Sequence, residues 1–398
     1  MIVTKRLLII SEAAGNNGGE GKKVIAKTPP MGWNSWVSFG EDVNEQLIKE
    51  VADAFVEHGL ADAGYEYIVI DDGWSLPQRD KNKRLVPDPD KFPSGIKALS
   101  DYVHSKGLKL GIYSCAGVQT CAGYPGSLEH EFIDAETFAE WGIDCLRYVY
   151  CYKPRSLEGR ILYRRMAMAL RNCGRDILLS TVNWGWDEPH KWMRSAGAHT
   201  WRSTGDLQDN WVSIKQVALE LVGHECYSAP YCFHDNDFLV AGVYGKGIIG
   251  LGGCTDEEYK TQFSLWCMMN SPLMIGCDVR NMNEATKAIL TNKELIAINQ
   301  DLEGRQAYTV TDWISEDLLY YVKLLSNGDL AITLVNFGDR RARAHIQFWD
   351  LGLPMAAGYG LKLTDLWNNE ELGVESAFYR SVLDPHCCQV LRAKVVKL

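Results

Sequence analysis

Short apolar runs alternate with amphipathic stretches along most of the chain, and this alternation limits the fold more than any other feature of the sequence. The apolar runs have the length of buried strands and the amphipathic stretches that of helices, so their order predicts a parallel sheet. The predicted strands cover residues 31–36, 65–74, 108–115, 145–151, 176–184, 199–206 and 271–278, with one more near Asp237. The predicted helices cover residues 43–60, 95–108, 157–172, 211–222 and 258–270.

About eight such units over roughly 250 residues match the size of a (β/α)8 barrel. A doubly wound sheet is the alternative, but no glycine-rich phosphate loop follows the first predicted strand. After Glu303 the pattern changes to apolar–polar alternation with turn signals at SNGD and FGD, which is typical of antiparallel strands. We therefore expect a flexible lead-in over residues 1–27, an α/β (β/α)8 TIM barrel over 28–302 and a small C-terminal antiparallel β-sandwich domain over 303–398.

The composition predicts a soluble protein that binds neither nucleic acid nor a membrane. The formal net charge is −10, and no basic block offsets it. The apolar run LLII at residues 7–10 is too short for the core of a signal peptide or for a membrane span. We expect a cytoplasmic protein; a secreted form and a homo-oligomer are left open.

Cysteines and aromatic residues are both numerous. The twelve cysteines are scattered, and no CxxC pair or His/Cys cluster has the spacing of a zinc site, so neither a metal nor a cofactor is expected. The chain also has 13 Trp and 18 Tyr, of which most are expected to pack in the core. The alternative use of such rings is stacking on the apolar faces of a sugar.

Polar residues gather where the predicted strands end, which in a barrel of this type is the face that carries the active site. They are Asp71, Asp72, Asn183, Arg202, Asp206 and Asp278. The adjacent acids Asp71 and Asp72 fit a metal site, catalysis, hydroxyl binding or a solvated turn. The neighbouring tryptophans, Trp36 among them, favour a sugar over a metal, because hard cations require several oxygen ligands. Arg202 and Asp206 fit either a salt-bridged pair or a general acid beside an arginine that binds hydroxyl groups.

Several long stretches of the chain resemble the α-galactosidases and α-N-acetylgalactosaminidases, family 27 of the glycoside hydrolases. The stretches are TPPMGWNSW (28–36), IDDGW (70–74), GLKLGIYS (107–114), TCAGYPGS (120–127), WGIDCLRY (141–148), WRSTGDLQDNW (201–211) and NSPLMIGCDVR (270–280). The resemblance runs from about Thr28 to the C-terminus. It implies a (β/α)8 barrel followed by an antiparallel β-domain.

The same resemblance implies a retaining hydrolase of terminal α-D-galactosides, with a galactose-containing oligosaccharide or glycoconjugate as partner. In a retaining mechanism one carboxylate forms a covalent glycosyl-enzyme, and a second donates and then accepts a proton. α-N-acetylgalactosaminidase and β-L-arabinopyranosidase activities are the alternatives within the family.

The resemblance also assigns roles to individual residues. Asp206 in WRSTGD matches the acid/base, Asp71 and Asp72 match the acceptors of the 4- and 6-hydroxyl groups, and Trp36 matches the stacking ring. Further substrate-binding positions fall on Tyr113, Cys121, Arg147, Asn183, Trp186, Arg202 and Asp237, with Arg147 where the family usually has lysine. Cys121 and Cys151 match a pair that is usually bridged beside the pocket; in a reducing compartment they would be free thiols.

Position 149 departs from the pattern of the family. The fourth strand of relatives usually ends in Lys-Tyr-Asp or Lys-Phe-Asp, one further residue and Cys, whereas this chain reads RYVYC at 147–151. Val149 therefore occupies the nucleophile position, and valine has no lone pair with which to attack. Tyr148 and Tyr150 are expected on the other face of the strand, because side chains alternate. Cys115 supplies no carboxylate either, so the chain as written is expected to be nearly inactive.

Three interpretations of Val149 follow. The favoured one is an α-galactosidase scaffold that has lost its nucleophile, since the rest of the pocket is complete. The second is a catalytically dead galactoside-binding protein, and the third is an enzyme with an altered mechanism.

The loop after the fifth strand bears on which sugar fits. It reads NWGWD at 183–187, and the ring of Trp186 is expected where a 2-acetamido group would need space. An acetamide left without hydrogen-bond partners would cost about 1–3 kcal/mol. The chain is therefore expected to prefer galactose to N-acetylgalactosamine, unless Trp186 turns outward and only packs the loop.

Overall fold

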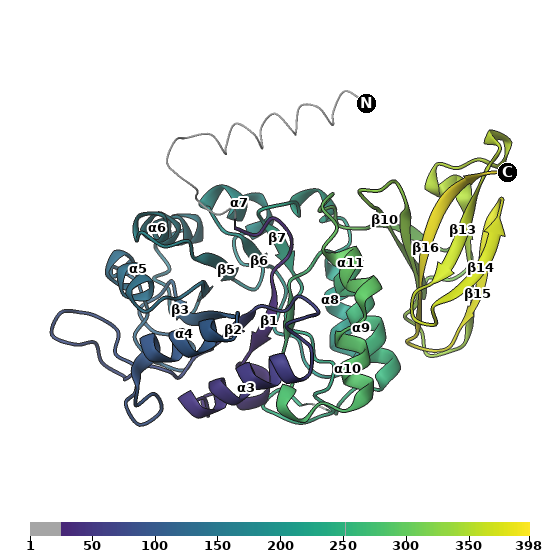
Figure 1. The fold of residues 1–398 in the computed structure, drawn as a ribbon. Coiled ribbons are helices and arrows are strands. Elements are labelled where there is room, and N and C mark those ends of the chain that lie inside the picture. Colours follow the sequence, from purple (N-terminus) through teal and green to yellow (C-terminus); the bar gives the residue numbers. More distant parts are fainter. Residues whose placement is uncertain (1–24, 251) are drawn as a thin grey trace.

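Eight short parallel strands follow one another around a closed sheet (Figure 1). The structure, a computed structural model, describes residues 25–250 and 252–398; most of the expected lead-in, with the apolar run at residues 7–10, lies outside this range. The strands are β1 (Met31–Asn34), β2 (Tyr67–Val69), β3 (Lys109–Cys115), β4 (Cys145–Val149), β5 (Leu178–Val182), β6 (Thr200–Arg202), β7 (Phe233–Asp235) and β8 (Leu273–Ile275). β1 pairs with both β2 and β8, and the circle closes between Leu239, just after β7, and Ile275. The predicted (β/α)8 barrel is confirmed.

Helices surround this barrel on its outer side (Figure 1). They are α2 (Trp36–Phe39), α3 (Glu45–Glu57), α4 (Gly95–Ser105), α5 (Glu131–Glu140), α6 (Gly159–Asn172), α7 (Met193–Ala196), α8 (Trp211–Glu220), α9 (Asp256–Met268), α10 (Glu284–Leu290) and α11 (Lys293–Asn299). Side-chain caps define several helix starts: Asn44 accepts a hydrogen bond from the backbone of Leu47, and Thr255 forms a reciprocal capping box with Glu258. All five predicted helices are present.

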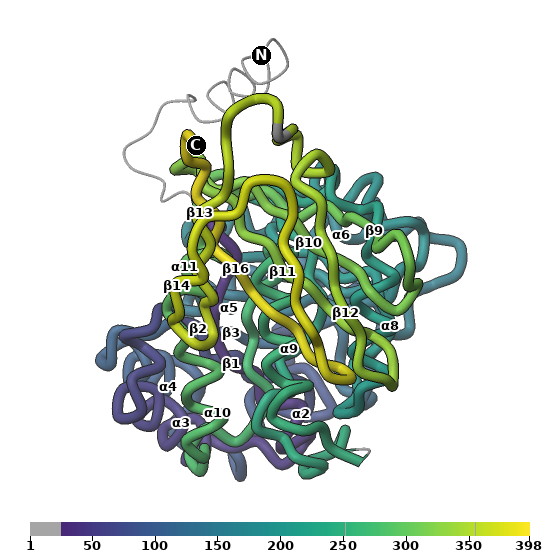
Figure 2. Tube along the Cα trace, turned by 90° about the vertical axis from the view of Figure 1, so that its right-hand side faces the viewer, coloured from purple at the N-terminus to yellow at the C-terminus, as the bar shows by residue number. Residues whose placement is uncertain are grey.

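The C-terminal part of the chain forms two antiparallel sheets (Figure 2). One has six strands in the order β14-β13-β16-β11-β10-β9, and the other pairs β12 with β15. The strands are β9 (Tyr308–Thr311), β10 (Leu318–Leu324), β11 (Leu330–Asn336), β12 (Ala342–Gln347), β13 (Tyr359–Asp365), β14 (Glu370–Glu375), β15 (Phe378–Leu383) and β16 (Cys388–Lys397). Tyr320, Leu334 and Leu391 of the large sheet share one buried core with Ile346 and Leu383 of the small one. The predicted β-sandwich is therefore present.

The other face of the large sheet packs on the barrel. Lys323 of β10 is almost fully buried there, and its Nζ donates hydrogen bonds to Oδ1 of Asn270 and to the carbonyl of Ile298, in the last turn of α11. A cation is favourable at the C-terminal end of a helix, where carbonyl groups lack partners. The two domains thus meet through a buried amine that makes two hydrogen bonds.

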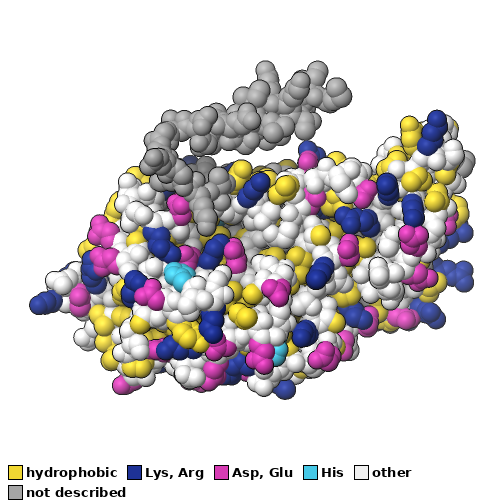
Figure 3. Space-filling view, in the orientation of Figure 1, with side chains coloured by type: hydrophobic (Ala, Val, Ile, Leu, Met, Phe, Trp, Pro, Cys, Tyr) yellow, Lys and Arg dark blue, Asp and Glu magenta, His cyan; other side chains and the backbone are white. Residues whose placement is uncertain are grey.

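The described surface carries charges of both signs. On the face shown in Figure 3, lysines and arginines lie among aspartates and glutamates, and neither sign dominates. Within residues 25–250 and 252–398, no helix combines the length and the apolar character needed to cross a membrane.

Candidate active site

A pocket of about 130 Å³ opens where the barrel strands end. Its walls come from most of the strands and the loops that follow them, as expected for the C-terminal face of a barrel. The lining residues are Trp36, Val37, Asp71, Asp72, Tyr113, Cys121, Arg147, Val149, Val182, Trp184, Arg202, Asp206, Leu207, Asp237, Phe238 and Ile249. The structure therefore brings together ten of the twelve residues that the sequence assigns to the site.

Asp71 and Asp72 follow β2 and are both buried. Oδ2 of Asp71 accepts a hydrogen bond of 2.6 Å from the Asn34 amide and lies 3.2 Å from Nε of Arg147. Oδ2 of Asp72 accepts one of 2.8 Å from the backbone N–H of Ala122. Burial raises the pKa of Asp72 to about 6, against the effect of hydrogen bonds from the backbone of Ala122 and Gly73 and the side chain of Thr120. Both carboxylates are fixed in place and have lone pairs left to accept ligand hydroxyl groups.

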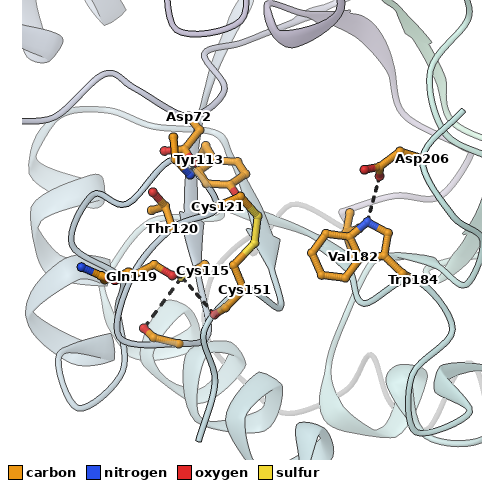
Figure 4. Close-up of a disulfide and its surroundings, with 12 residues drawn as sticks. Asp72, Tyr113, Cys115, Gln119, Thr120, Cys121, Cys151, Val182, Trp184 and Asp206 are labelled. Atoms are coloured by element: carbon orange, nitrogen blue, oxygen red, sulfur yellow. Dashed lines mark hydrogen bonds between the residues drawn. A yellow bond between two sulfur atoms is a disulfide. The ribbon is translucent and has the colours of Figure 1, made fainter. Parts of the chain in front are cut away.

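Asp206 lies in the β6–α8 loop and is held by two donors. Nη2 of Arg202 and Nε1 of Trp184, the latter at 2.8 Å, both donate to its Oδ1 (Figure 4). The side chain of Asp206 is 69% exposed, and the partial loss of water in the pocket acts to raise its pKa. The charge of Arg202 and the hydrogen bond from Trp184 outweigh this effect, so this pKa lies below its ordinary value. Arg202 also contacts Oδ1 of Asp237 through Nη1, at 2.5 Å. Asp206 is therefore a fixed and mostly ionised carboxylate at neutral pH.

β4 presents alternate residues to the pocket and to the helices outside the barrel. Arg147 and Val149 line the pocket. Tyr148 and Tyr150 point the other way, and each packs on the ring of Tyr163 in α6 at a centroid distance of 5.6 Å. The expected alternation is confirmed, so neither tyrosine of this strand reaches the pocket and Val149 contributes only an apolar surface.

A disulfide joins Cys121 to Cys151 at the edge of the pocket (Figure 4). It ties the loop after β3 to the residues that follow β4, and the Tyr113 hydroxyl donates to Sγ of Cys121 at 3.3 Å. The thiol of Cys115 does not line the pocket and instead donates to the carbonyl of Gln119. Burial raises the pKa of Cys115 to about 12, so this thiol stays neutral and is no substitute for a carboxylate.

Asn183 and Trp186 are the two assigned residues that do not line the pocket. Asn183 is buried and bonds within its own loop, and the ring of Trp186 is 67% exposed. The cause is the backbone: Trp184 has φ 54° and Gly185 has φ 84°, both left-handed. This turn directs Trp184 into the pocket and the chain after it outward. The role expected of Trp186 is not supported by its position.

Six further lining residues were not assigned from the sequence. They are Val37, Val182, Trp184, Leu207, Phe238 and Ile249. Most are apolar, and apolar side chains near strand ends look like core in a sequence. Only Trp184 could have been suspected from the sequence, because the stretch NWGW has two tryptophans and either could face the pocket. Asp278, another strand-end acid, lies outside the pocket lining and pairs with Arg280 at 2.8 Å.

The pocket combines fixed carboxylates, guanidinium groups and aromatic rings, a set suited to a neutral ligand rich in hydroxyl groups. Among the described residues, no group of three or more His, Cys, Asp or Glu side chains is arranged to hold a metal ion.

Comparisons with known proteins agree with this geometry. The family model described as Alpha galactosidase A matches residues 28–301, and the Alpha galactosidase C-terminal beta sandwich domain matches residues 315–393. An alpha-galactosidase of Cyamopsis tetragonoloba is 42% identical over 367 residues, which are 92% of this chain and 86% of that protein.

Two solved structures are similar over nearly the whole chain. Alpha-galactosidase I from Mortierella vinacea has a TM-score of 0.86 and 34% identity, covering 94% of this chain and 98% of its own. The alpha-galactosidase of Saccharomyces cerevisiae, solved with raffinose, has a TM-score of 0.84 and 28% identity with the same coverage. With the barrel, the sandwich and the pocket in place, the chain belongs to the α-galactosidase family, family 27 of the glycoside hydrolases.

Proposed function

We propose that the pocket binds the terminal galactosyl group of α-D-galactosides, and that Val149 leaves the chain nearly unable to hydrolyse them. Asp71 and Asp72 accept hydrogen bonds from sugar hydroxyl groups, the ring of Trp36 stacks on the sugar, and Asp206 stands beside the glycosidic oxygen. The raffinose in the S. cerevisiae relative, a galactose-containing trisaccharide, supports this ligand class.

The observation that carries the proposal is the side chain of Val149 in the pocket wall. A retaining hydrolase needs a second carboxylate opposite the acid/base to attack the anomeric carbon. The other pocket carboxylates are already engaged: Asp71 with Arg147, Asp72 with backbone N–H groups, and Asp237 with Arg202. An isopropyl group at position 149 neither attacks nor stabilises positive charge in the transition state.

The test is to measure hydrolysis of an aryl α-galactoside by the unmodified chain and by Val149→Asp. The substitution should raise kcat by several powers of ten, on the order of the loss that follows removal of a nucleophile in other hydrolases. Val182→Asp is the matched control, because it places the same carboxylate on the pocket wall from the neighbouring strand, and it should not restore activity. Turnover at a rate typical of hydrolases by the unmodified chain would overturn the proposal.

A galactoside-binding protein without catalysis is the second candidate, and it is favoured by the intact acceptors. Asp71 and Asp72 are held by hydrogen bonds from Asn34 and from the backbone of Ala122, and neither bond involves residue 149. Calorimetry with millimolar galactose should therefore detect weak binding by the unmodified chain. Absence of binding by a folded chain would count against a preserved pocket.

We further propose that galactose is preferred to N-acetylgalactosamine. The residue responsible for this preference is Trp184 and not Trp186. The Trp184 ring and Val182 line the pocket on the side of Asp206 (Figure 4), where the anomeric carbon and its neighbour, the 2-position, are expected to lie. A 2-acetamido group would need volume that the indole occupies. The Val149→Asp form should cleave the aryl galactoside faster than its N-acetylated counterpart or an aryl β-L-arabinopyranoside. Faster cleavage of either alternative would reassign the activity within the family.

A further inference from the structure

Two tryptophan rings meet on the open surface of the C-terminal domain. Trp313 is 73% exposed and Trp349 is 57% exposed, yet their ring centroids are only 6.4 Å apart at an interplanar angle of 74°. Ile314, next to Trp313, is 88% exposed. Single exposed apolar residues are ordinary, whereas adjacent large ones mark surfaces that bind something.

The backbone beneath both rings is firmly held. Trp313 lies in the turn after β9, where Oδ1 of Asp312 accepts hydrogen bonds from the N–H groups of Ile314 and Ser315 at 2.8 and 2.9 Å. The other oxygen of Asp312 accepts from the hydroxyl of Tyr320. The rings are therefore displayed by an ordered turn, and their exposure is not a result of loose packing.

Trp349 is displayed in the same way from the other sheet. It belongs to the short 3-10 helix η4 (Phe348–Leu351), which directly follows β12. Phe348 is buried in the core between the sheets, and its N–H donates to the carbonyl of Ala377 at 2.9 Å. Because neighbouring residues anchor the helix, the indole of Trp349 is free to contact a ligand without any change in the core.

The charged residues close to the two rings in sequence narrow the chemistry of that ligand. In residues 308–317 and 348–353 every charged side chain is acidic: Asp312, Glu316, Asp317 and Asp350. Acidic groups repel nucleic acid and anionic lipid, and they accept hydrogen bonds from hydroxyl groups. Aromatic faces pack against the C–H groups of a sugar ring. Together they fit a neutral, hydroxyl-rich chain.

We propose that Trp313 and Trp349 form a carbohydrate-binding platform, separate from the barrel pocket, that holds a neutral polysaccharide. Two rings inclined to each other contact successive sugar units better than a single one, so the platform should favour chains over monosaccharides. This site does not depend on the activity at position 149, because none of its residues lines the pocket.

The experiment is native affinity electrophoresis of the full chain through gels containing a soluble β-glucan, a neutral polysaccharide without galactosyl groups for the pocket to bind. The unmodified protein should be retarded, and Trp313→Ala or Trp349→Ala should each weaken binding by about tenfold, which corresponds to losing roughly 1.4 kcal/mol of contact. Val374→Ala is the matched control: Val374 is a 52% exposed apolar residue on β14, at the opposite edge of the same sheet. Thermal melting checks that all variants fold.

A second variant separates the platform from the pocket. Asp71→Asn removes a charged acceptor of the pocket and should leave the retardation unchanged. The proposal is overturned if the tryptophan variants migrate like the parent, or if Asp71→Asn abolishes retardation while they retain it. Sedimentation that reveals a dimer dissociated by Trp313→Ala would also overturn it, because the rings would then be a contact between copies.

Discussion

The carboxylates of the pocket show how neighbours set the charge of a single residue. Asp72 is buried and has only uncharged hydrogen-bond donors close by, whereas Asp206 is more exposed and has the full charge of Arg202 beside it. The pKa of Asp72 is therefore raised and that of Asp206 lowered. A general acid must hold a proton, and a second carboxylate at position 149 would help Asp206 to do so. Valine gives no such help.

The raised pKa of Asp72 predicts a pH dependence of binding. Only the ionised carboxylate accepts hydrogen bonds with both oxygens, so affinity for galactose should fall as the pH drops through about 6. At pH 5 binding should be about tenfold weaker than at pH 8, because roughly one molecule in ten would remain ionised. Calorimetry across this range measures the effect.

Asp72→Asn is the control for this prediction. It keeps the shape of the side chain and removes the titration, so its binding should be weak at every pH without an inflection near 6. An inflection that persists in this variant would assign the pH dependence to another group.

The sequence was a reliable guide at residues whose position follows from strand geometry. Tyr148 and Tyr150 face outward as expected, because β4 stays regular to its end. It failed for Trp186, since two consecutive left-handed residues redirect the chain after Asn183. Trp184 itself is one of them, and a left-handed tryptophan leaves no signal in a single sequence, unlike a glycine.

At the level of elements, the sequence-based prediction missed several helices, and buried charge explains one of them. α5 is absent from the sequence-based prediction because its inner face carries Glu131 and Asp134, both buried. Arg79 neutralises Asp134 at 2.6 Å and Arg165 lies 3.0 Å from Glu131. Such partners are distant in sequence, so a buried acid looks like a solvent-exposed one until the fold is known.

The disulfide between the β3–α5 loop and the end of β4 is predicted to stabilise both the fold and the pocket. The Cys121–Cys151 bridge closes a separation of 30 residues and should contribute about 3.6 kcal/mol to the free energy of unfolding. The double variant Cys121→Ser, Cys151→Ser should lose this amount in urea unfolding. It should also bind galactose more weakly, because the adjacent N–H of Ala122 orients Asp72.

Cys226→Ser provides the comparison, since Cys226 is an exposed free thiol. It should unfold like the parent. Equal stability of the double variant and the parent would mean that the bridge contributes nothing under the conditions used, as in a reducing solution. This measurement does not test the cytoplasmic location expected from the sequence, which stays a prediction.

For the whole molecule, Lys323 predicts how the contact between the domains responds to pH. Burial lowers its pKa to about 7, far below that of an exposed lysine. The unfolded chain thus binds more protons than the folded one between pH 7 and 10, so stability should rise with pH in this window. From pH 7 to 9 the gain should be about 2 kcal/mol, and it should vanish below pH 7, where the amine is charged in both states.

Urea unfolding at several pH values tests this expectation. Lys323→Met should flatten the increase between pH 7 and 9, whereas Lys394→Met, at an exposed position on β16, should keep it. The same slope in the parent and in Lys323→Met would show that the amine does not titrate on unfolding.

The order of the six-stranded sheet leaves β14 as one of its two edges, and this has a consequence for self-association in concentrated solution. Unpaired strand edges recruit strands from other molecules and seed aggregates. Here Glu370 and Glu375 are exposed along the edge, and the pairing with β13 shifts register where Gly373 adopts φ 92°. An incoming copy would meet like charge and a kinked backbone. At acidic pH the exposed glutamates would be protonated and would no longer repel an incoming strand, but the kink in the backbone would remain.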